Sequence, residues 1–319
     1  MEENTIDLKD TEGRFSQLSM WKLKSKFISQ QNDPPMAKRN SSGSLITSPH
    51  LLKELYLETY RERLKRREIK PELKDLSDFK LELWKFVLED MNRNKTKDWT
   101  ESDLEKALKS MKKNKTRDPH DLINELFKEG IMGKDMKLAL LSVFNQIKRD
   151  QKLPTALKFA NITSLYKNKG SRLNLENDRG IFVVSTLRMI LDTLIYQEKF
   201  PLIDMNMSCS NIGSRRNRNI RDHLFIIYAI INSVINGEEE QVDIQIYDVV
   251  KCFDELWLED CMLDMVFTLP RHARDDRVSL LYKMNEESLV AVKTPVGLTK
   301  RIPLSNIVMQ GGKWGSLQF

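Results

Sequence analysis

The segment VDIQIYD, residues 242–248, places a carboxylate where its pattern calls for an apolar side chain. With the two-residue period of a strand, Asp248 falls on the same side as an aliphatic row that begins at Val242. A carboxylate in such a row costs free energy unless it meets a cation or hydrogen-bond donors. Magnesium is one such cation, because it binds one or two carboxylates together with substrate phosphates. The alternative is an acid at a strand end that accepts backbone N–H groups, and the peptide by itself favours that alternative.

Clusters of basic side chains are the second chemical signal. Lys and Arg number 52 against 46 Asp and Glu, which gives a net charge of +6. The charge gathers in residues 61–70, in residues 106–117 and in the group Arg215, Arg216, Arg218 and Arg221. One such cluster is typical of a solvated helix face. Three in one chain favour a polyanionic partner such as nucleic acid.

Length and composition limit the class of protein. With 319 residues, 40% hydrophobic, and only 12 Gly and 10 Pro, the chain is neither collagen-like nor wholly disordered and can form one large or two small domains. The cysteines Cys209, Cys252 and Cys261 lack the spacing of a disulfide framework or a zinc site. Neither a signal peptide nor an apolar run of the ~20 residues that cross a bilayer is visible. We therefore expect an intracellular protein, cytoplasmic or nuclear or both, that is not secreted and has no membrane partner.

The elements that must position these side chains fall into three regions. Residues 1–49 are polar and rich in turn-forming residues from 32 onward, and they are predicted to be a flexible linker. Residues 50–150 have the 3.6-residue period of helices, and Thr100 with Asp103 forms a capping-box pattern. Residues 151–319 mix helices and strands, so the expected fold class is α+β.

The individual elements are predicted from periodicity and turn residues. Helices are expected near residues 51–60, 77–91, 101–111, 121–129, 134–149, 186–199, 220–235, 255–267 and 275–284. Strands are expected at residues 159–167, 180–185 and 242–248, with a hairpin around Pro295, Val296 and Gly297.

Six blocks of the sequence carry a resemblance to one known family. They read KKNKTRDPHDLINELFK, ANITSLYKNKG, ENDRGIFVVSTLRMILDTLIY, SNIGSRRNRNIRDHLF, IQIYDVVKCFDELWLEDC and VAVKTPVGLTKRIPLSNIVMQGG. Over about residues 100–319 the chain resembles the reverse transcriptases of non-LTR (LINE-type) retrotransposons. One block would be a weak signal, whereas six in order are specific. The resemblance implies a helical N-terminal region, residues 50–150, followed by the fingers and a partial palm of a right-hand polymerase, residues 151–319.

The resemblance also implies a reaction and its partners. Such enzymes are RNA-directed DNA polymerases, nucleotidyltransferases that copy an RNA template onto a DNA primer from deoxynucleoside triphosphates. Asp248 matches their first catalytic aspartate, which shares two Mg²⁺ ions with the incoming nucleotide. In this context the metal-binding interpretation of Asp248 replaces the strand-end interpretation.

Other positions match residues that contact the nucleotide. Lys167 and Arg179 match fingers residues that hold the triphosphate, where cations neutralise phosphate charge. Phe253 matches the aromatic residue that excludes a 2′-hydroxyl by a clash. By residue type alone, Lys167 and Arg179 would be surface charges on a hairpin and Phe253 would be a core residue.

Two further blocks match contacts to the nucleotide and template. Gln310 and Gly311 match the Gln-Gly pair beside the nucleotide and template base, where glycine lets the backbone approach closely. The loop with Arg215, Arg216 and Arg218 matches a block that meets the template backbone, a contact that is independent of sequence and sensitive to salt.

The sequence also departs from the family pattern. Arg179 is followed by Gly180 where most of these enzymes have Pro. The family's second aspartate motif, an x-x-D-D turn, follows the Gln-Gly pair, and no such doublet occurs between Gln310 and Phe319. One carboxylate cannot hold two metal ions, so this polypeptide alone is expected to polymerise little or nothing. The alternatives are a non-catalytic RNA-binding remnant and a decayed copy that does not fold stably.

Overall fold

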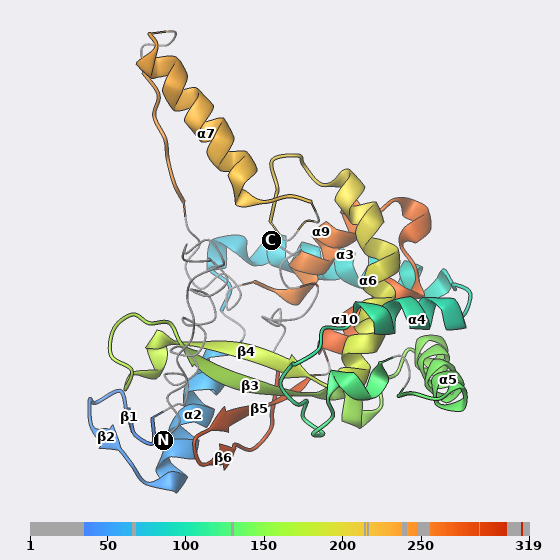
Figure 1. Cartoon of the computed structure of the whole chain (residues 1–319), viewed down its shortest axis with the longest axis horizontal. Coiled ribbons are helices and arrows are strands. Elements are labelled where there is room, and N and C mark those ends of the chain that lie inside the picture. The colour runs from blue at the N-terminus through green and yellow to red at the C-terminus, as the bar shows by residue number, and fades with distance from the viewer. Residues whose placement is uncertain are drawn as a thin grey trace, which may run out of the picture. The chain divides into compact units, whose positions relative to one another are not determined.

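The computed structural model describes residues 35–65, 68–128, 131–213, 215, 217–237, 241–247, 256–286, 288–304 and 314. The fold is α+β, as the sequence predicts (Figure 1). The chain divides into two compact units. The first unit comprises residues 1–59, 163–180 and 292–299, and the second comprises residues 60–162, 181–291 and 300–319.

A five-stranded sheet contains the hairpin that carries Lys167 and Arg179. Its strands are β3 (Phe159–Tyr166), β4 (Asp178–Val184), β5 (Leu289–Thr294), β6 (Gly297–Leu298) and β7 (Ile302–Pro303). They lie in the order β4-β3-β5-β6, and β7 also pairs with β5. Both β6 and β7 run antiparallel to β5. The strands predicted near residues 159–167 and 180–185 and the hairpin predicted near residue 296 are confirmed.

Residues 35–48, expected to be part of a flexible linker, include a short hairpin. β1 (Lys38–Arg39) pairs antiparallel with β2 (Leu45–Ile46). In the turn between them, the side chain of Asn40 accepts a hydrogen bond from the N–H of Ser44 at 2.9 Å. Asn, Ser and Gly are common in tight turns as well as in linkers. Composition therefore could not distinguish the two.

The second unit is mainly helical. The helices in chain order, including α2 at the boundary between the units, are α2 (Pro49–Arg63), α3 (Lys74–Arg93), α4 (Glu101–Ser110), α5 (Lys134–Asp150), α6 (Thr186–Asn206), α7 (Ile220–Ile235), α9 (Leu258–Thr268) and α10 (Asp276–Glu286). Short 3₁₀ turns lie at Pro71–Leu73, Asn124–Phe127, Thr155–Lys158, Leu175–Asn177 and Arg271–Ala273. α4 packs against α5 and α6, while α10 packs against α3, α6 and α9. The core between them includes Trp84, Leu104, Phe144, Ile190 and Met262.

The predicted capping box at the start of α4 is confirmed. The N–H of Asp103 donates to Thr100 Oγ1 at 3.3 Å, and the N–H of Thr100 donates to the Asp103 carboxylate at 2.9 Å. Partial burial raises the pKa of Asp103, but the hydrogen bonds from Thr100 outweigh burial, so the pKa lies below its ordinary value. Local sequence therefore determines where this helix begins.

The helix predicted over residues 121–129 is wrong. Only the 3₁₀ turn Asn124–Phe127 forms there among the described residues. Asp121 has a φ of +60°, in the left-handed region, which an α-helix does not contain. The carboxylate of Asp118 also accepts hydrogen bonds from two backbone N–H groups of this stretch, those of His120 and Leu122. A side chain that bonds nearby backbone groups competes with the helix for them.

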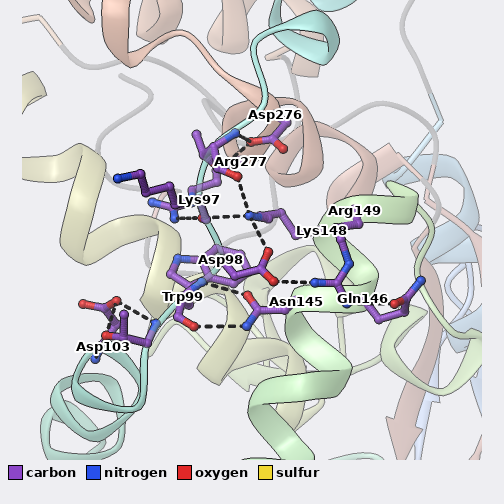
Figure 2. A network of polar contacts seen from close by, with 12 residues as sticks. Lys97, Asp98, Trp99, Asp103, Asn145, Gln146, Lys148, Arg149, Asp276 and Arg277 are labelled. Atoms are coloured by element: carbon purple, nitrogen blue, oxygen red, sulfur yellow. Dashed lines mark hydrogen bonds and ion pairs between the residues drawn. The ribbon is translucent and has the colours of Figure 1, made fainter.

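A buried lysine joins α5 to the irregular segment 95–100 that precedes α4, as Figure 2 shows. The ammonium group of Lys148 donates to two carbonyl oxygens of that segment, at 2.8 and 2.7 Å, and pairs with Asp98 at 3.0 Å. Asn145, also on α5, bonds the N–H and the C=O of Trp99 at 2.8 and 3.0 Å. Side chains thus satisfy backbone groups that no regular element pairs.

A buried ion pair joins α6 to the residue before α10. The ammonium group of Lys199 contacts the carboxylate of Asp275. Burial lowers the pKa of Lys199 and raises the pKa of Asp275, and the attraction between the two groups opposes both shifts. We interpret this pair, with the Lys148 contacts, as scaffold of the second unit.

The strand predicted over residues 242–248 is wrong for the described part, residues 242–247. These residues belong to no strand, and their apolar side chains are exposed, from 37% at Val242 to 91% at Ile246. Alternation of apolar and polar residues indicates a segment that could bury one face. A β-strand also needs a neighbouring strand that supplies its backbone hydrogen bonds.

α7 is confirmed with the predicted bounds, residues 220–235, and its start is fixed by a capping box between Asn219 and Asp222. Its apolar side chains are largely exposed, for example Phe225 at 72%. No helix within the described ranges combines the length and the apolar character needed to span a membrane.

Candidate nucleotide and nucleic-acid sites

The part of the β3–β4 hairpin that belongs to the first unit, residues 163–180, presents the two predicted triphosphate residues on one face. Ser164 and Asp178 are buried, and the Ser164 hydroxyl donates to the Asp178 carboxylate at 2.9 Å, so these two side chains share the buried face. Successive side chains of a strand point to opposite faces. Arg179, the next residue of β4, therefore points to the other face and is exposed. Lys167, three residues after Ser164, follows the same alternation and is also exposed.

The contacts of Lys167 extend the pairing of the two strands. Its N–H donates to the carbonyl oxygen of Asn177 at 2.8 Å, and its ammonium group approaches the carbonyl oxygen of Glu176 at 3.4 Å. Arg179 forms no ion pair with any other residue that the structure describes. The hairpin therefore offers two solvent-accessible cations to an anionic ligand.

A buried ion pair lies on the opposite face of the same hairpin. The ammonium group of Lys38 donates to the Asp178 carboxylate at 2.8 Å and to the carbonyl oxygen of Arg172 at 2.9 Å. Sequence reasoning missed Lys38, because it lies in the region predicted to be linker. The available signal was Asp178, which lies on the same face of β4 as the buried Phe182. A carboxylate on a buried face needs a cation or hydrogen-bond donors. That signal does not identify the partner.

The second unit contains a stretch of exposed cations that we call the basic segment, residues 109–117. It holds five cations and no acid, and all five side chains are exposed. They are Lys109, Lys112, Lys113, Lys115 and Arg117. Within the described part of the chain none of them forms an ion pair. Such an array can bind the phosphates of a nucleic acid.

The backbone on either side of the basic segment is anchored. Asp118 is buried, and its carboxylate accepts the N–H groups of His120 at 2.8 Å, Leu122 at 2.9 Å and Thr186 at 2.7 Å. Thr186 is the first residue of α6, where the helix dipole favours a negative charge. At the other end, Lys128 donates to carbonyl oxygens at the end of α4. The exposed cations are therefore held on a fixed backbone.

The predicted template-contact arginines differ from one another. Arg215 donates to the Asp204 carboxylate at 2.6 Å and to three backbone carbonyl oxygens, so its guanidinium group organises the loop before α7. Arg218 is exposed. Arg216 lies outside the described residues. The template-contact role of the three stays a prediction.

Four other predicted site residues, Asp248, Phe253, Gln310 and Gly311, lie outside the described residues, and their roles stay predictions. In the ranges that the structure describes, no three His, Cys, Asp or Glu side chains gather as a metal site. The structure therefore exposes Lys167 and Arg179 on the same hairpin and gives no geometry for Asp248. No protein-family model matches the chain, and no curated protein matches it significantly.

Proposed function

We propose that the chain carries the fingers and the beginning of the palm of an RNA-directed DNA polymerase of the non-LTR retrotransposon type. In this proposal the β3–β4 hairpin binds the triphosphate of the incoming deoxynucleotide. The six ordered sequence blocks support the family. The observation that carries the proposal is that Lys167 and Arg179 are both exposed on one face of the hairpin, opposite the buried Asp178.

The proposed reaction is attack of the primer 3′-hydroxyl on the α-phosphorus of the nucleotide, with release of pyrophosphate. Lys167 and Arg179 neutralise charge on the β- and γ-phosphates, which increases on the leaving pyrophosphate. Asp248 would hold Mg²⁺, which supplies Lewis-acid activation of the hydroxyl and the phosphates when bound. Phe253 would exclude a 2′-hydroxyl, and Gln310 with Gly311 would lie beside the nucleotide and the template base.

The test is the affinity of the purified chain for dATP and for dAMP, measured by equilibrium binding with Mg²⁺ present. A charge-assisted hydrogen bond contributes about 1.5–3 kcal/mol, and the lower end applies to exposed groups. We therefore expect Lys167→Ala and Arg179→Ala each to weaken dATP binding roughly tenfold while dAMP binding changes little. The matched control is Lys169→Ala, which removes the same charge from an exposed position in the same loop. Equal losses at Lys167 and Lys169, or equal losses for dATP and dAMP, would contradict the proposal.

A second candidate function, RNA binding without catalysis, is favoured by the exposed basic segment. Binding through phosphates weakens as salt rises, with a slope of about −0.7 per phosphate neutralised on a single strand. Replacing Lys112, Lys113 and Lys115 by Ala should therefore reduce the salt slope for a single-stranded RNA by roughly two. This function predicts no effect of Asp248→Asn on that affinity.

A charge-matched control distinguishes RNA binding by the basic segment from electrostatic attraction due to net charge. It replaces three exposed lysines that are well separated along the chain, Lys74 and Lys85 on α3 and Lys95 just after it, by Ala. If both triple variants lose RNA affinity to the same extent, net charge explains the binding and the basic segment has no special role. An affinity that does not depend on salt would exclude binding through phosphates altogether.

A further inference from the structure

Lys38 is a charged side chain that the fold buries almost completely. It is 1% exposed and its partner Asp178 is 3% exposed, at a distance of 2.8 Å. The ammonium group also lies 6.0 Å from the ring centroid of Tyr56. Taking two charges out of water has a large cost, which only good geometry and further hydrogen bonds offset. Here Ser164 and the carbonyl oxygen of Arg172 provide those further bonds.

The hydrogen-bonded cluster around Lys38 includes residues from all three parts of the hairpin. Ser164 belongs to β3, Arg172 to the loop 167–177, and Asp178 to β4. A single ammonium group therefore contacts the loop and β4 directly and reaches β3 through the shared carboxylate. Moving any of the three parts would break at least one of these bonds.

The backbone of β1 reinforces the same connection. The N–H of Arg39 donates to the carbonyl oxygen of Leu173 at 2.9 Å, and Arg39 forms an isolated parallel bridge with Asn174. β1 thus lies along the loop 167–177, in which Lys167 is the first residue. The short segment around residue 38 is part of the hairpin structure.

The register of Asp178 determines where Arg179 points. The two residues are adjacent in β4, so the bond that holds Asp178 on the buried face holds Arg179 on the exposed face. Lys167 depends on the same cluster through Ser164, three residues before it. A slip of one residue in the pairing would turn one of the two cations away from the face that carries the other.

We propose that Lys38 is a positioning residue that locks the β3–β4 hairpin in the register in which Lys167 and Arg179 face the nucleotide triphosphate. This inference rests on the proposed function. Lys38 does not touch the ligand, since it lies on the opposite face of the hairpin. Its effect is carried by Asp178 and by the carbonyl oxygen of Arg172.

The experiment compares Lys38→Met with Arg39→Met in the full chain. Both remove one positive charge from β1, but Arg39 is exposed whereas Lys38 is buried. Two properties are measured: the ratio of the affinities for dATP and dAMP, and hydrogen exchange of the amides of Lys167 and Asn177. We expect Lys38→Met to lower that ratio about tenfold and to speed exchange at both amides, because small displacements of binding groups have large effects. Arg39→Met should leave both properties within twofold of the unsubstituted chain.

A second variant covers the case in which Lys38→Met does not fold, since it leaves the Asp178 charge buried without its ammonium partner. Lys38→Met combined with Asp178→Asn removes both charges, and the amide oxygen can still accept the bond from Ser164. The double variant should fold and still show the reduced ratio, because the carbonyl oxygen of Arg172 has lost its donor. A ratio equal to that of Arg39→Met would overturn the positioning role.

The outcomes separate this inference from the proposed function. If the unsubstituted chain binds dATP no better than dAMP, the proposed function fails, and the exchange measurement alone then shows whether Lys38 holds the hairpin. If dATP is preferred but Lys38→Met keeps that preference while exchange increases, the ion pair is structural only and the inference is wrong.

Discussion

Substitution of Asp118 tests how the basic segment is anchored. Its carboxylate accepts three backbone N–H groups: one oxygen binds His120 and Leu122, and the other binds Thr186 at the start of α6. Asp118→Asn keeps an amide oxygen for the first two and presents an NH₂ group to Thr186. Asp118→Ala removes both acceptor oxygens and so all three hydrogen bonds.

The expected losses follow from these contacts. In Asp118→Asn one charge-assisted hydrogen bond of about 1.5–3 kcal/mol is lost, together with about 0.3–1 kcal/mol from the negative charge at a helix N-terminus. The free energy of unfolding should fall by about 2–4 kcal/mol. In Asp118→Ala two more donors lose their acceptor, at a cost of about 1–3 kcal/mol for each if buried, and the expected total is about 4–6 kcal/mol because such terms do not fully add.

The assay is urea denaturation followed by circular dichroism, in which a shifted midpoint with an unchanged slope reports stability. Asp121→Asn is the matched control, because Asp121 is exposed in the same loop and its left-handed backbone suits Asn. It should change stability by less than about 0.5 kcal/mol. Hydrogen exchange should increase only at the Thr186 amide in Asp118→Asn, and at all three amides in Asp118→Ala. Equal stability of Asp118→Asn and Asp121→Asn would refute this account of the anchor.

Three further changes test the scaffold of the second unit. Lys148→Met should lower the unfolding free energy by about 2–4 kcal/mol, because two carbonyl oxygens lose their donor, whereas Lys152→Met at an exposed position should be nearly neutral in the same denaturation assay. Asp103→Asn should cost about 1 kcal/mol near neutral pH through the weakened cap. Because the folded-state pKa of Asp103 is lowered, its contribution is present above the ordinary value of 3.8 and is lost as pH falls through the folded value, so urea titrations from pH 5 to pH 2 should show the variant and the unsubstituted chain converging. Phe225→Ser on the exposed face of α7 should change stability by less than about 0.5 kcal/mol and raise solubility, while the buried Phe144→Ala should cost about 3–5 kcal/mol.

The hairpin that carries Lys167 and Arg179 could be predicted from the sequence. The strands near Lys167 and Arg179 follow from alternation and from the polar loop between them, and both cations are exposed as surface charges of a hairpin would be. The basic segment is visible as a run of cations without acids. What no pattern indicated is that Asp118 ends this segment by capturing the first amide of α6, which lies 68 residues further along the chain.

The sequence by itself determined the elements whose causes are local. The capping box of Thr100 and Asp103 starts α4, and the apolar period of residues 220–235 produces α7, because these patterns involve residues within one or two turns of each other. Tertiary structure alone decided the conformation and the contacts of segments whose local preference is weak or competes with other interactions. Alternation did not make a strand of residues 242–247, since a strand depends on a partner elsewhere in the chain. Lys38 is the counter-ion of Asp178, which lies 140 residues away in the sequence. Folding removes both charges from water, and the attraction between them offsets the cost of that desolvation.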